Sequence, residues 1–204
     1  MDGYALAYRL GLTPWERYGG AAGESIRTRL DREAAERPQP PGRALDLGCG
    51  RGQYTDELTR RGWAVVGIDR VPGAVDAARR RGIPGAGFVV GDVTDLVAAD
   101  LGSFDFFFDV GCFQGLDPAQ RRAAGRGISQ LANPGATLLM LAFGVTRLRP
   151  LAGGVSRAEV EEAFPGWELL SAEPGDTAGL GWPMSRMSPT WYRLRRVSTP
   201  DVRS

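Results

Sequence analysis

The stretch Asp46-Leu47-Gly48-Cys49-Gly50-Arg51-Gly52 decides the fold of this chain. It stands between an apolar run at residues 43–47 and a helical pattern over residues 53–61. Glycine at every second position lets the backbone approach a ligand closely and adopt positive φ angles. A turn that joins a strand to a helix in this way lies at the carboxyl edge of a sheet, where open α/β folds bind their ligands. We therefore expect a ligand site at this turn.

The spacing of the glycines distinguishes between ligand classes. A dinucleotide-binding turn has its third glycine three residues after the second. Here Gln53 holds that position, and the glycine comes one residue early, at Gly52. A P-loop requires Gly-Lys followed by Ser or Thr, and the chain contains no lysine. The turn therefore disfavours a dinucleotide and excludes a P-loop nucleotide site.

Apolar runs and helical patterns alternate on both sides of this turn. Alternation of this kind predicts right-handed crossovers and a mostly parallel sheet. Near the C-terminus the pattern changes: Ser156 caps a short helix, and two further strands are joined by a loop that favours an antiparallel pair. The expected strands are residues 43–47, 63–68, 88–90, 104–110, 137–143, 167–171 and 191–197, and the expected helices are residues 23–37, 53–61, 73–81, 117–132 and 156–164.

Composition narrows the classes of function. The 204 residues suit one domain, and a net charge of +1 carries no electrostatic footprint of a DNA- or RNA-binding protein. Histidine is absent, which removes imidazole as a general base, and Cys49 and Cys112 alone cannot form a zinc site, so we expect no metal. The chain has no apolar run of membrane-spanning length and no signal-peptide pattern at its N-terminus. We expect a cytoplasmic protein that binds neither nucleic acid nor membrane.

Residues 44–52 resemble the first motif of the class I methyltransferases that use S-adenosylmethionine (SAM). The resemblance extends through Asp69, Gly91-Asp92 and the fourth and fifth strands, and it covers roughly residues 43–145. It implies an α/β fold with a Rossmann-like, seven-stranded, mostly parallel sheet, an antiparallel C-terminal strand and helices on both faces. We expect one structural domain, in which residues 1–41 form an N-terminal lid and helix and residues 42–204 form the SAM-binding methyltransferase domain.

The resemblance also implies roles for individual residues. Asp46 would lie near the ammonium group of SAM, and Asp69 would accept both ribose hydroxyls. Asp92 would accept from the adenine amino group, with Val93 supplying backbone contacts. For each aspartate taken alone, the alternative is a helix N-cap, which is the commoner role of an aspartate at the end of a strand. The remaining expected cofactor contacts are Gly48, Gly50, Gly52, Arg70, Trp15 and Arg17.

The fourth strand and its exit, residues 104–116, would border the methyl group that is transferred. This stretch resembles small-molecule methyltransferases related to the thiopurine and halide/thiol group, as does the segment Thr13-Pro14-Trp15. Because histidine is absent, Asp109 is the best-placed candidate for a general base. Its alternative is a cofactor-side acceptor or a cap. The expected substrate contacts are Cys112, Phe113, Gln114 and Trp15.

Two arginine-containing segments complete the expectations. Residues 1–20 carry four aromatic side chains without helical or strand periodicity, which favours a lid over cofactor and acceptor, with Arg17 pairing with the SAM carboxylate. The alternative is a short helix docked permanently on the domain. The run Arg121-Arg122, together with Arg126, is typical of a solvated helix face.

The function implied by the resemblance is methyl transfer from SAM to an O, S or N atom of a small organic acceptor, with secondary metabolism as one setting. Two alternatives stay open. One is a SAM-binding cyclase or pericyclic catalyst, and the other is a non-catalytic SAM-fold binding or regulatory subunit. The sequence leaves the identity of the acceptor and the oligomeric state undetermined, because fold alone does not fix function.

Overall fold

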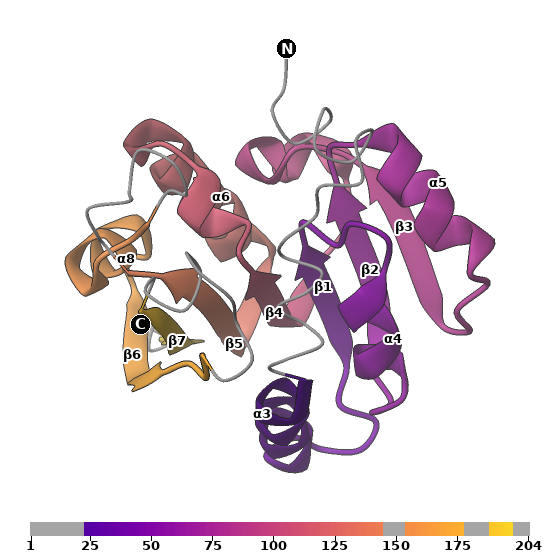
Figure 1. The fold of residues 1–204 in the computed structure, drawn as a ribbon, viewed down its shortest axis with the longest axis horizontal. Coiled ribbons are helices and arrows are strands. Elements are labelled where there is room, and N and C mark those ends of the chain that lie inside the picture. Colours follow the sequence, from indigo (N-terminus) through magenta and orange to yellow (C-terminus); the bar gives the residue numbers. More distant parts are fainter. Residues whose placement is uncertain (1–22, 145–153, 178–187, 198–204) are drawn as a thin grey trace, which may run out of the picture.

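Seven strands form a single sheet in the computed structural model, which describes residues 23–144, 154–177 and 188–197 (Figure 1). The strand order is β3-β2-β1-β4-β5-β7-β6. Pairs from β3 to β5 are parallel, whereas β7 is antiparallel to both of its neighbours. The predicted fold class is confirmed. The strands are β1 (Arg43–Leu47), β2 (Ala64–Asp69), β3 (Ala86–Val90), β4 (Phe104–Val110), β5 (Ala132–Phe143), β6 (Trp167–Pro174) and β7 (Pro189–Arg196).

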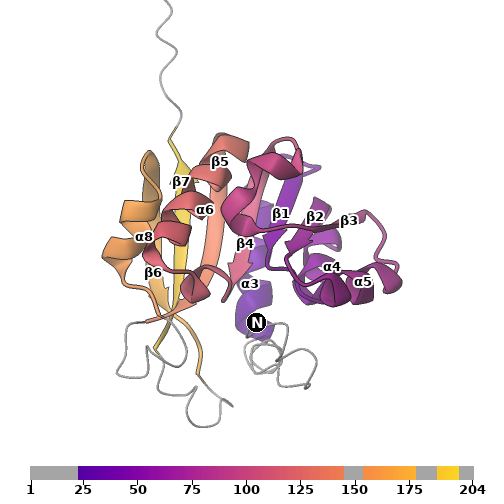
Figure 2. The ribbon, with the colours of Figure 1, turned by 90° about the horizontal axis from the view of Figure 1, so that it is seen from above.

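Helices cover both faces of this sheet. Figure 2 shows α4 and α5 beside the end of the sheet that carries β2 and β3, and α6 and α8 beside the end that carries β5 to β7. The α-helices are α3 (Gly23–Ala35), α4 (Gln53–Thr59), α5 (Pro72–Arg80), α6 (Pro118–Leu131) and α8 (Arg157–Ala163). Three short 3-10 turns are η1 (Val93–Asp95), η2 (Val97–Ala99) and η3 (Phe113–Gly115).

Two buried clusters lie on opposite faces of the central strand β4. Phe104 and Phe107 belong to the cluster that includes Ile128 of α6, whereas Phe106 and Phe108 belong to the cluster that includes Leu30 of α3. All four phenylalanines are fully buried. They are therefore core residues, as predicted for a strand covered on both faces.

The pairing of β5 with the start of β4 is irregular. Ala132 pairs with Phe104 and Thr137 pairs with Phe106, so residues 133–136 lie opposite Asp105 alone. Asn133 Nδ2 donates to Asp105 Oδ1 over 2.8 Å and fixes this bulge. Residues 133–135, expected to form the loop after the helix, thus lie inside the strand. Bulges of this kind re-aim the neighbouring side chains.

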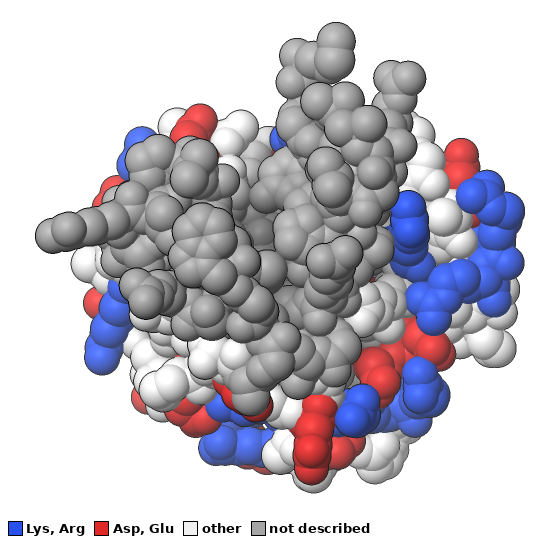
Figure 3. Space-filling model, in the orientation of Figure 1, with Lys and Arg blue, Asp and Glu red and all other residues white. Residues whose placement is uncertain are grey.

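The helix α3 is bound firmly to the sheet through buried polar contacts. The Glu33 side chain is 1% exposed, and its Oε2 accepts from Arg193 Nε of β7 over 2.8 Å. Thr137 of β5 donates to the other oxygen of the same carboxylate. Acidic and basic side chains also lie side by side along the lower rim in Figure 3, where Figure 1 places α3. Residues 1–22, with the predicted lid and its Trp15 and Arg17, lie outside the described residues.

Candidate cofactor and acceptor site

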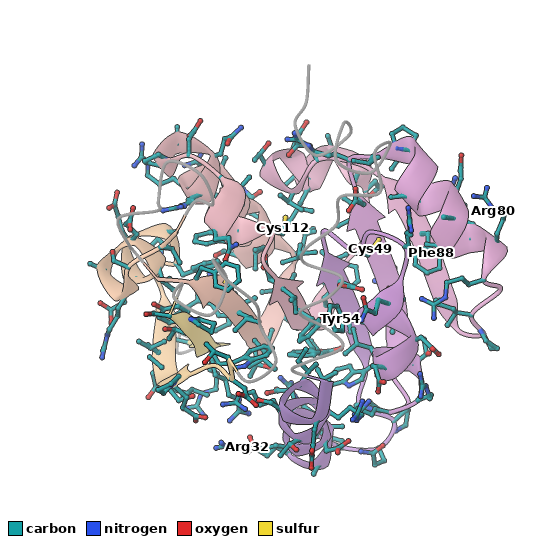
Figure 4. The ribbon with its side chains drawn as sticks, viewed as in Figure 1. Arg32, Cys49, Tyr54, Arg80, Phe88 and Cys112 are labelled. Atoms are coloured by element: carbon teal, nitrogen blue, oxygen red, sulfur yellow. The ribbon has the colours of Figure 1, made fainter. Side chains whose placement is uncertain are left out.

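The glycine-rich turn adopts a backbone that only glycine accommodates easily. Gly48, Gly50 and Gly52 have φ angles of 67°, 54° and 73°, in the left-handed region that L-residues avoid. A Cβ on Gly48 would lie 2.8 Å from Cys112 Cβ, and one on Gly52 would lie 3.0 Å from Phe88 Cζ. Figure 4 shows Cys49 and Cys112 on either side of the upper end of β1. The sequence pattern therefore marks a turn that is both strained for other residues and closely packed.

Asp69, at the end of β2, holds the turn in place. Its Oδ2 accepts from the Gly50 N–H over 2.9 Å, and its Oδ1 accepts from the Val71 N–H over 2.8 Å. The N-cap residue of α5 is Val71, so Asp69 does not fill the helix-cap role weighed as its alternative. The carboxylate is 9% exposed. It ties the glycine-rich turn to the neighbouring strand at the position that the resemblance assigns to ribose binding.

Asp46, at the end of β1, is the most deeply buried acidic group of the turn. The residue is 2% exposed, and its Oδ2 accepts from Thr55 Oγ1 of α4 over 2.6 Å. The pKa of Asp46 is raised from 3.8 to about 7, chiefly by burial and also by the nearby Asp69 carboxylate, against the lowering effect of the hydrogen bonds from Thr55. A buried carboxylate of this kind is stabilised in its ionised form when a cation binds beside it.

Asp92 and Val93 follow β3, at the same edge of the sheet. Asp92 is exposed and is the N-cap of the turn η1, where its Oδ1 accepts from the Thr94 N–H over 2.8 Å. The cap interpretation thus describes its contacts among the described residues, and an adenine contact stays a prediction. Val93 is buried beneath this turn, and Arg70 is exposed at the end of β2.

A cleft opens to solvent over the glycine-rich turn. Its volume is about 210 Å³, smaller than the roughly 300–1,000 Å³ of typical sites for whole drug-sized ligands. The cleft combines the buried Asp46 carboxylate with the glycine-rich backbone of residues 48–50. These features fit an amino-acid moiety that carries an ammonium group. The lining residues are Asp46, Leu47, Gly48, Cys49, Gly50, Arg51, Gln53, Tyr54, Arg81 and Val110.

The cleft has lining residues that the sequence did not single out. Arg81 follows α5, and its Nη1 donates to the carbonyl oxygens of Arg51 and Gly52. Tyr54 lies at the start of α4, edge-on to Phe108 at 5.6 Å between ring centroids. An arginine after a helix and an aromatic residue inside one have no sequence signature that separates them from surface and core residues. Their position follows from how α4 and α5 pack on the sheet.

Both carboxylate oxygens of Asp109, the candidate base, accept hydrogen bonds from the backbone. It is 3% exposed, and its two oxygens accept from the N–H groups of Cys112 and Phe113, each over 3.0 Å. Burial raises the pKa of Asp109 to about 7, against the lowering effect of these bonds. Asp109 does not line the cleft, whereas its neighbour Val110 does. The described geometry therefore matches the capping alternative more closely than the catalytic one, and the catalytic role stays a prediction.

The three predicted substrate residues after β4 have different surroundings. Phe113 is 2% exposed and packs against Phe164 at 5.5 Å between ring centroids, as a core residue does. Gln114 Oε1 accepts from the Phe143 N–H and so joins the exit of β4 to the end of β5. Cys112 lies against Gly48, and burial raises the pKa of its thiol well above the ordinary value. Of the three, Cys112 is the one placed against the glycine-rich turn.

Arg121 of α6 is buried, so the prediction of a solvated face is wrong for this residue. Its side chain is 5% exposed, and its Nη2 donates to the carbonyl oxygens of Gln114 and Gly154, each over 2.9 Å. Its Nη1 donates to Glu159 Oε1 over 2.9 Å. Arg122 and Arg126 are exposed, as expected. Arg121 therefore links the segments that follow β4 and β5, and the arginine run gave no signal of it.

Within residues 23–144, 154–177 and 188–197, no group of three or more acidic or cysteine side chains is arranged to hold a metal ion. Of the helices in the same ranges, none is long and apolar enough to cross a membrane.

Comparisons with known proteins agree with this geometry. Residues 44–135 match the family model described as a methyltransferase domain. An uncharacterized methyltransferase of Synechocystis is 31% identical over 152 residues, which cover 69% of this chain and 67% of the relative. The 2-heptyl-1-hydroxyquinolin-4(1H)-one methyltransferase of Mycobacteroides abscessus is 30% identical over 128 residues, which cover 59% of this chain and 56% of the relative.

The fold also matches a solved methyltransferase structure. The N-methyltransferase NodS from Bradyrhizobium japonicum, in complex with S-adenosylhomocysteine (SAH), superposes with a TM-score of 0.70 at 18% identity, over 94% of this chain and 92% of that chain. The chain spans little more than half the length of the Mycobacteroides relative. By its sequence match and its sheet order, the chain belongs to the class I SAM-dependent methyltransferases, the family whose cofactor is S-adenosylmethionine.

Proposed function

We propose that this protein transfers the methyl group of SAM to an O, S or N atom of a small organic acceptor. The observation that carries the proposal is the cradle at the end of β1, where the Gly48 turn lies beside the buried carboxylate of Asp46. Asp46, Gly48 and Gly50 line a cleft of about 210 Å³. The match to the methyltransferase family supports the same reaction.

The residues of the cradle would bind and orient the cofactor. Asp46 would bind the ammonium group of SAM. The backbone of Gly48 and Gly50 would allow the methionine part of SAM to approach closely. Asp69 would accept the ribose hydroxyls while it keeps its bond to the Gly50 N–H. The cofactor supplies an activated methyl group, so the protein's task is to align the acceptor and exclude water.

The contacts of Asp109 bear on the class of acceptor. Because both of its oxygens accept backbone N–H groups, this carboxylate is poorly disposed to remove a proton from an acceptor. We therefore favour acceptors that ionise readily in water, such as thiols and acidic ring hydroxyls. The relative named for a hydroxyquinolone supports the ring hydroxyl as the first class to test. We also propose that the protein is related to the thiopurine and halide/thiol methyltransferases and acts in secondary metabolism.

The test is a product assay with the full chain. The protein is incubated with SAM and a panel of hydroxylated aromatic rings, thiols and amines, and products are identified by mass spectrometry. We expect one acceptor class to gain a methyl group while an equal amount of SAH forms. Asp69→Ala should abolish turnover, because it removes the acceptor of the Gly50 N–H as well as the ribose contact.

Other outcomes would select the alternatives. A rearranged or cyclised product without SAH formation would identify a SAM-binding cyclase or pericyclic catalyst. Tight SAM binding without turnover on any acceptor class would favour a regulatory or binding subunit. Each outcome would contradict the proposed methyl transfer.

A further inference from the structure

The buried pair formed by Asp46 and Thr55 has a geometry that goes beyond simple packing. Thr55 is fully buried in α4, nine residues after Asp46, and its hydroxyl donates to Asp46 Oδ2 over 2.6 Å. A threonine in a helix usually turns its hydroxyl back to a carbonyl of the preceding turn. Thr28 and Thr59 do so, donating to the carbonyl oxygens of Glu24 and Asp56. Thr55 instead directs its hydroxyl at the carboxylate.

The charged groups around Asp46 are predominantly acidic. Asp69 lies beside it from β2, and Asp109 lies close enough in β4 for the Asp46 charge to raise its pKa. Two arginines, Arg51 and Arg81, line the same cleft. Arg81 donates to the carbonyl oxygens of Arg51 and Gly52 and to the Asp56 carboxylate. The hydrogen bonds from Thr55 lower the pKa of Asp46 and so favour its ionised form.

We propose that Thr55 is a positioning residue for cofactor binding, because its hydroxyl holds the Asp46 carboxylate in the ionised form that receives the cofactor's ammonium group. The inference rests on the proposed function, since it takes SAM as the ligand. Binding then requires an ionised Asp46, and protonation of this carboxylate competes with SAM. Removal of the Thr55 hydroxyl shifts that competition toward the protonated form.

The experiment measures the dissociation constants of SAM and SAH for the wild type, Thr55→Val and Thr55→Ser by calorimetry between about pH 6 and about pH 8.5. At each pH, the dissociation constant of the variant is divided by that of the wild type. Titration of the ligand itself affects both constants equally and cancels in this ratio. A hydrogen bond to a charged group shifts a pKa by about one unit or more. For Thr55→Val we therefore expect a ratio of about tenfold near pH 6 that falls to within about twofold near pH 8.5.

Two variants separate this role from general packing. Thr55→Ser keeps the hydroxyl, so its ratio should stay near one at every pH. Thr59→Val is the matched control, because Thr59 lies in the same helix and donates to the Asp56 carbonyl rather than to Asp46. Should Thr55→Val fail to fold, Thr55→Ala gives the same comparison without a bulky side chain.

The outcomes distinguish this inference from the proposed function. If the wild type binds neither SAM nor SAH, the proposed function fails and the role of Thr55 fails with it. If the wild type binds SAM but the ratio for Thr55→Val does not change with pH, only the role of Thr55 is wrong. A Thr55→Ser variant that behaves like Thr55→Val would overturn the inference in the same way.

Discussion

At the scale of single residues, the site is dominated by carboxylates that the fold removes from water. Burial raises the pKa values of Asp46 and Asp109 to about 7. In the unfolded chain both groups titrate near 3.8, so between about pH 4 and about pH 7 the folded state binds more protons than the unfolded state. The free energy of unfolding contributed by these groups therefore falls as the pH rises through this range. Without ligand, the site costs stability at neutral pH.

Asp46→Asn should therefore stabilise the unliganded protein while it abolishes SAM binding. The rise from 3.8 to about 7 is about three pKa units, or about 4 kcal/mol. Solvent relaxation around Asp46 reduces this free energy. We therefore expect the free energy of unfolding of Asp46→Asn to exceed that of the wild type by on the order of 2 kcal/mol near pH 8. Urea unfolding across pH measures it, and the gain should shrink toward about pH 4.

The control is Asp76→Asn, which changes an exposed carboxylate paired with Arg79 on the surface of α5. It should alter the free energy of unfolding by less than about 0.5 kcal/mol at every pH. An Asp46→Asn variant that is less stable than the wild type near pH 8 would show that the charge of Asp46 is compensated within the unliganded fold.

Gly48→Ala should damage both stability and cofactor binding. The substitution places a Cβ at positive φ and 2.8 Å from Cys112 Cβ, so we expect a loss of about 2–4 kcal/mol. Gly82→Ala is the control, because Gly82 has a φ of 59° with no atom within 4 Å of its Cβ position. It should cost about 1 kcal/mol and leave SAM affinity unchanged. Equal losses in urea unfolding would mean that backbone strain alone explains Gly48.

At the scale of elements, the helices α6 and α8 pack unusually closely. A Cβ on Gly125 of α6 would lie 1.9 Å from the carbonyl oxygen of Ala163 in α8. That atom belongs to the backbone, so the helices must separate to admit a methyl group. Arg121 and Glu159 bridge the same two helices, and the contact therefore also supports the segments after β4 and β5.

Gly125→Ala should lower the free energy of unfolding by about 2–3 kcal/mol, even though alanine favours helices by about 1 kcal/mol. Gly73→Ala is the matched control, because Gly73 lies in α5 with no atom within 4 Å of its Cβ position. It should be neutral or stabilising by up to about 1 kcal/mol. If denaturant unfolding gives the same change for both glycines, α6 and α8 have room that the structure does not indicate.

The attachment of α3 gives a second prediction at this scale. Glu33→Ala removes the buried acceptor of Arg193 and Thr137, although Arg193 keeps Glu36 as a partner, and should cost about 2–3 kcal/mol. Glu161→Ala removes the exposed partner of Arg157 in α8 and should cost at most about 1 kcal/mol. Chemical denaturation of both variants provides the comparison. A small loss for Glu33→Ala would mean that α3 is held by its apolar face alone.

At the scale of the whole molecule, the sequence predicted the features that depend on local pattern. Glycine spacing predicted the turn of positive φ angles after β1, and the apolar run Phe104–Val110 was predicted with the bounds that the structure has. The bulge in β5 was missed, because Asn133 to Gly135 is a loop signal that the sheet overrides. Arg121 and Thr55 were missed because their partners lie on other elements, and no pattern within a helix reveals a distant carbonyl or carboxylate.

For the aspartates at the edge of the sheet, the sequence likewise predicted the positions but not the contacts. Asp46 and Asp69 were singled out because each lies at the end of a strand, and both lie at the glycine-rich turn. Whether such a residue contacts a ligand or caps a turn depends on the backbone after it. Asp69 and Asp109 each accept two backbone N–H groups, which a sequence cannot display. The edge of the sheet was therefore predictable, and the contacts of its side chains were not.

The measurement that tests the central claim most directly is the thermal unfolding of the full chain with SAM, SAH or NADH. A ligand at a hundredfold excess over its dissociation constant stabilises the folded state by about 2.7 kcal/mol. We predict stabilisation by SAM and by SAH, no effect of NADH, and loss of the SAM effect in Asp69→Ala, whose carboxylate holds the Gly50 N–H. Stabilisation by NADH with no response to SAM or SAH would contradict the account.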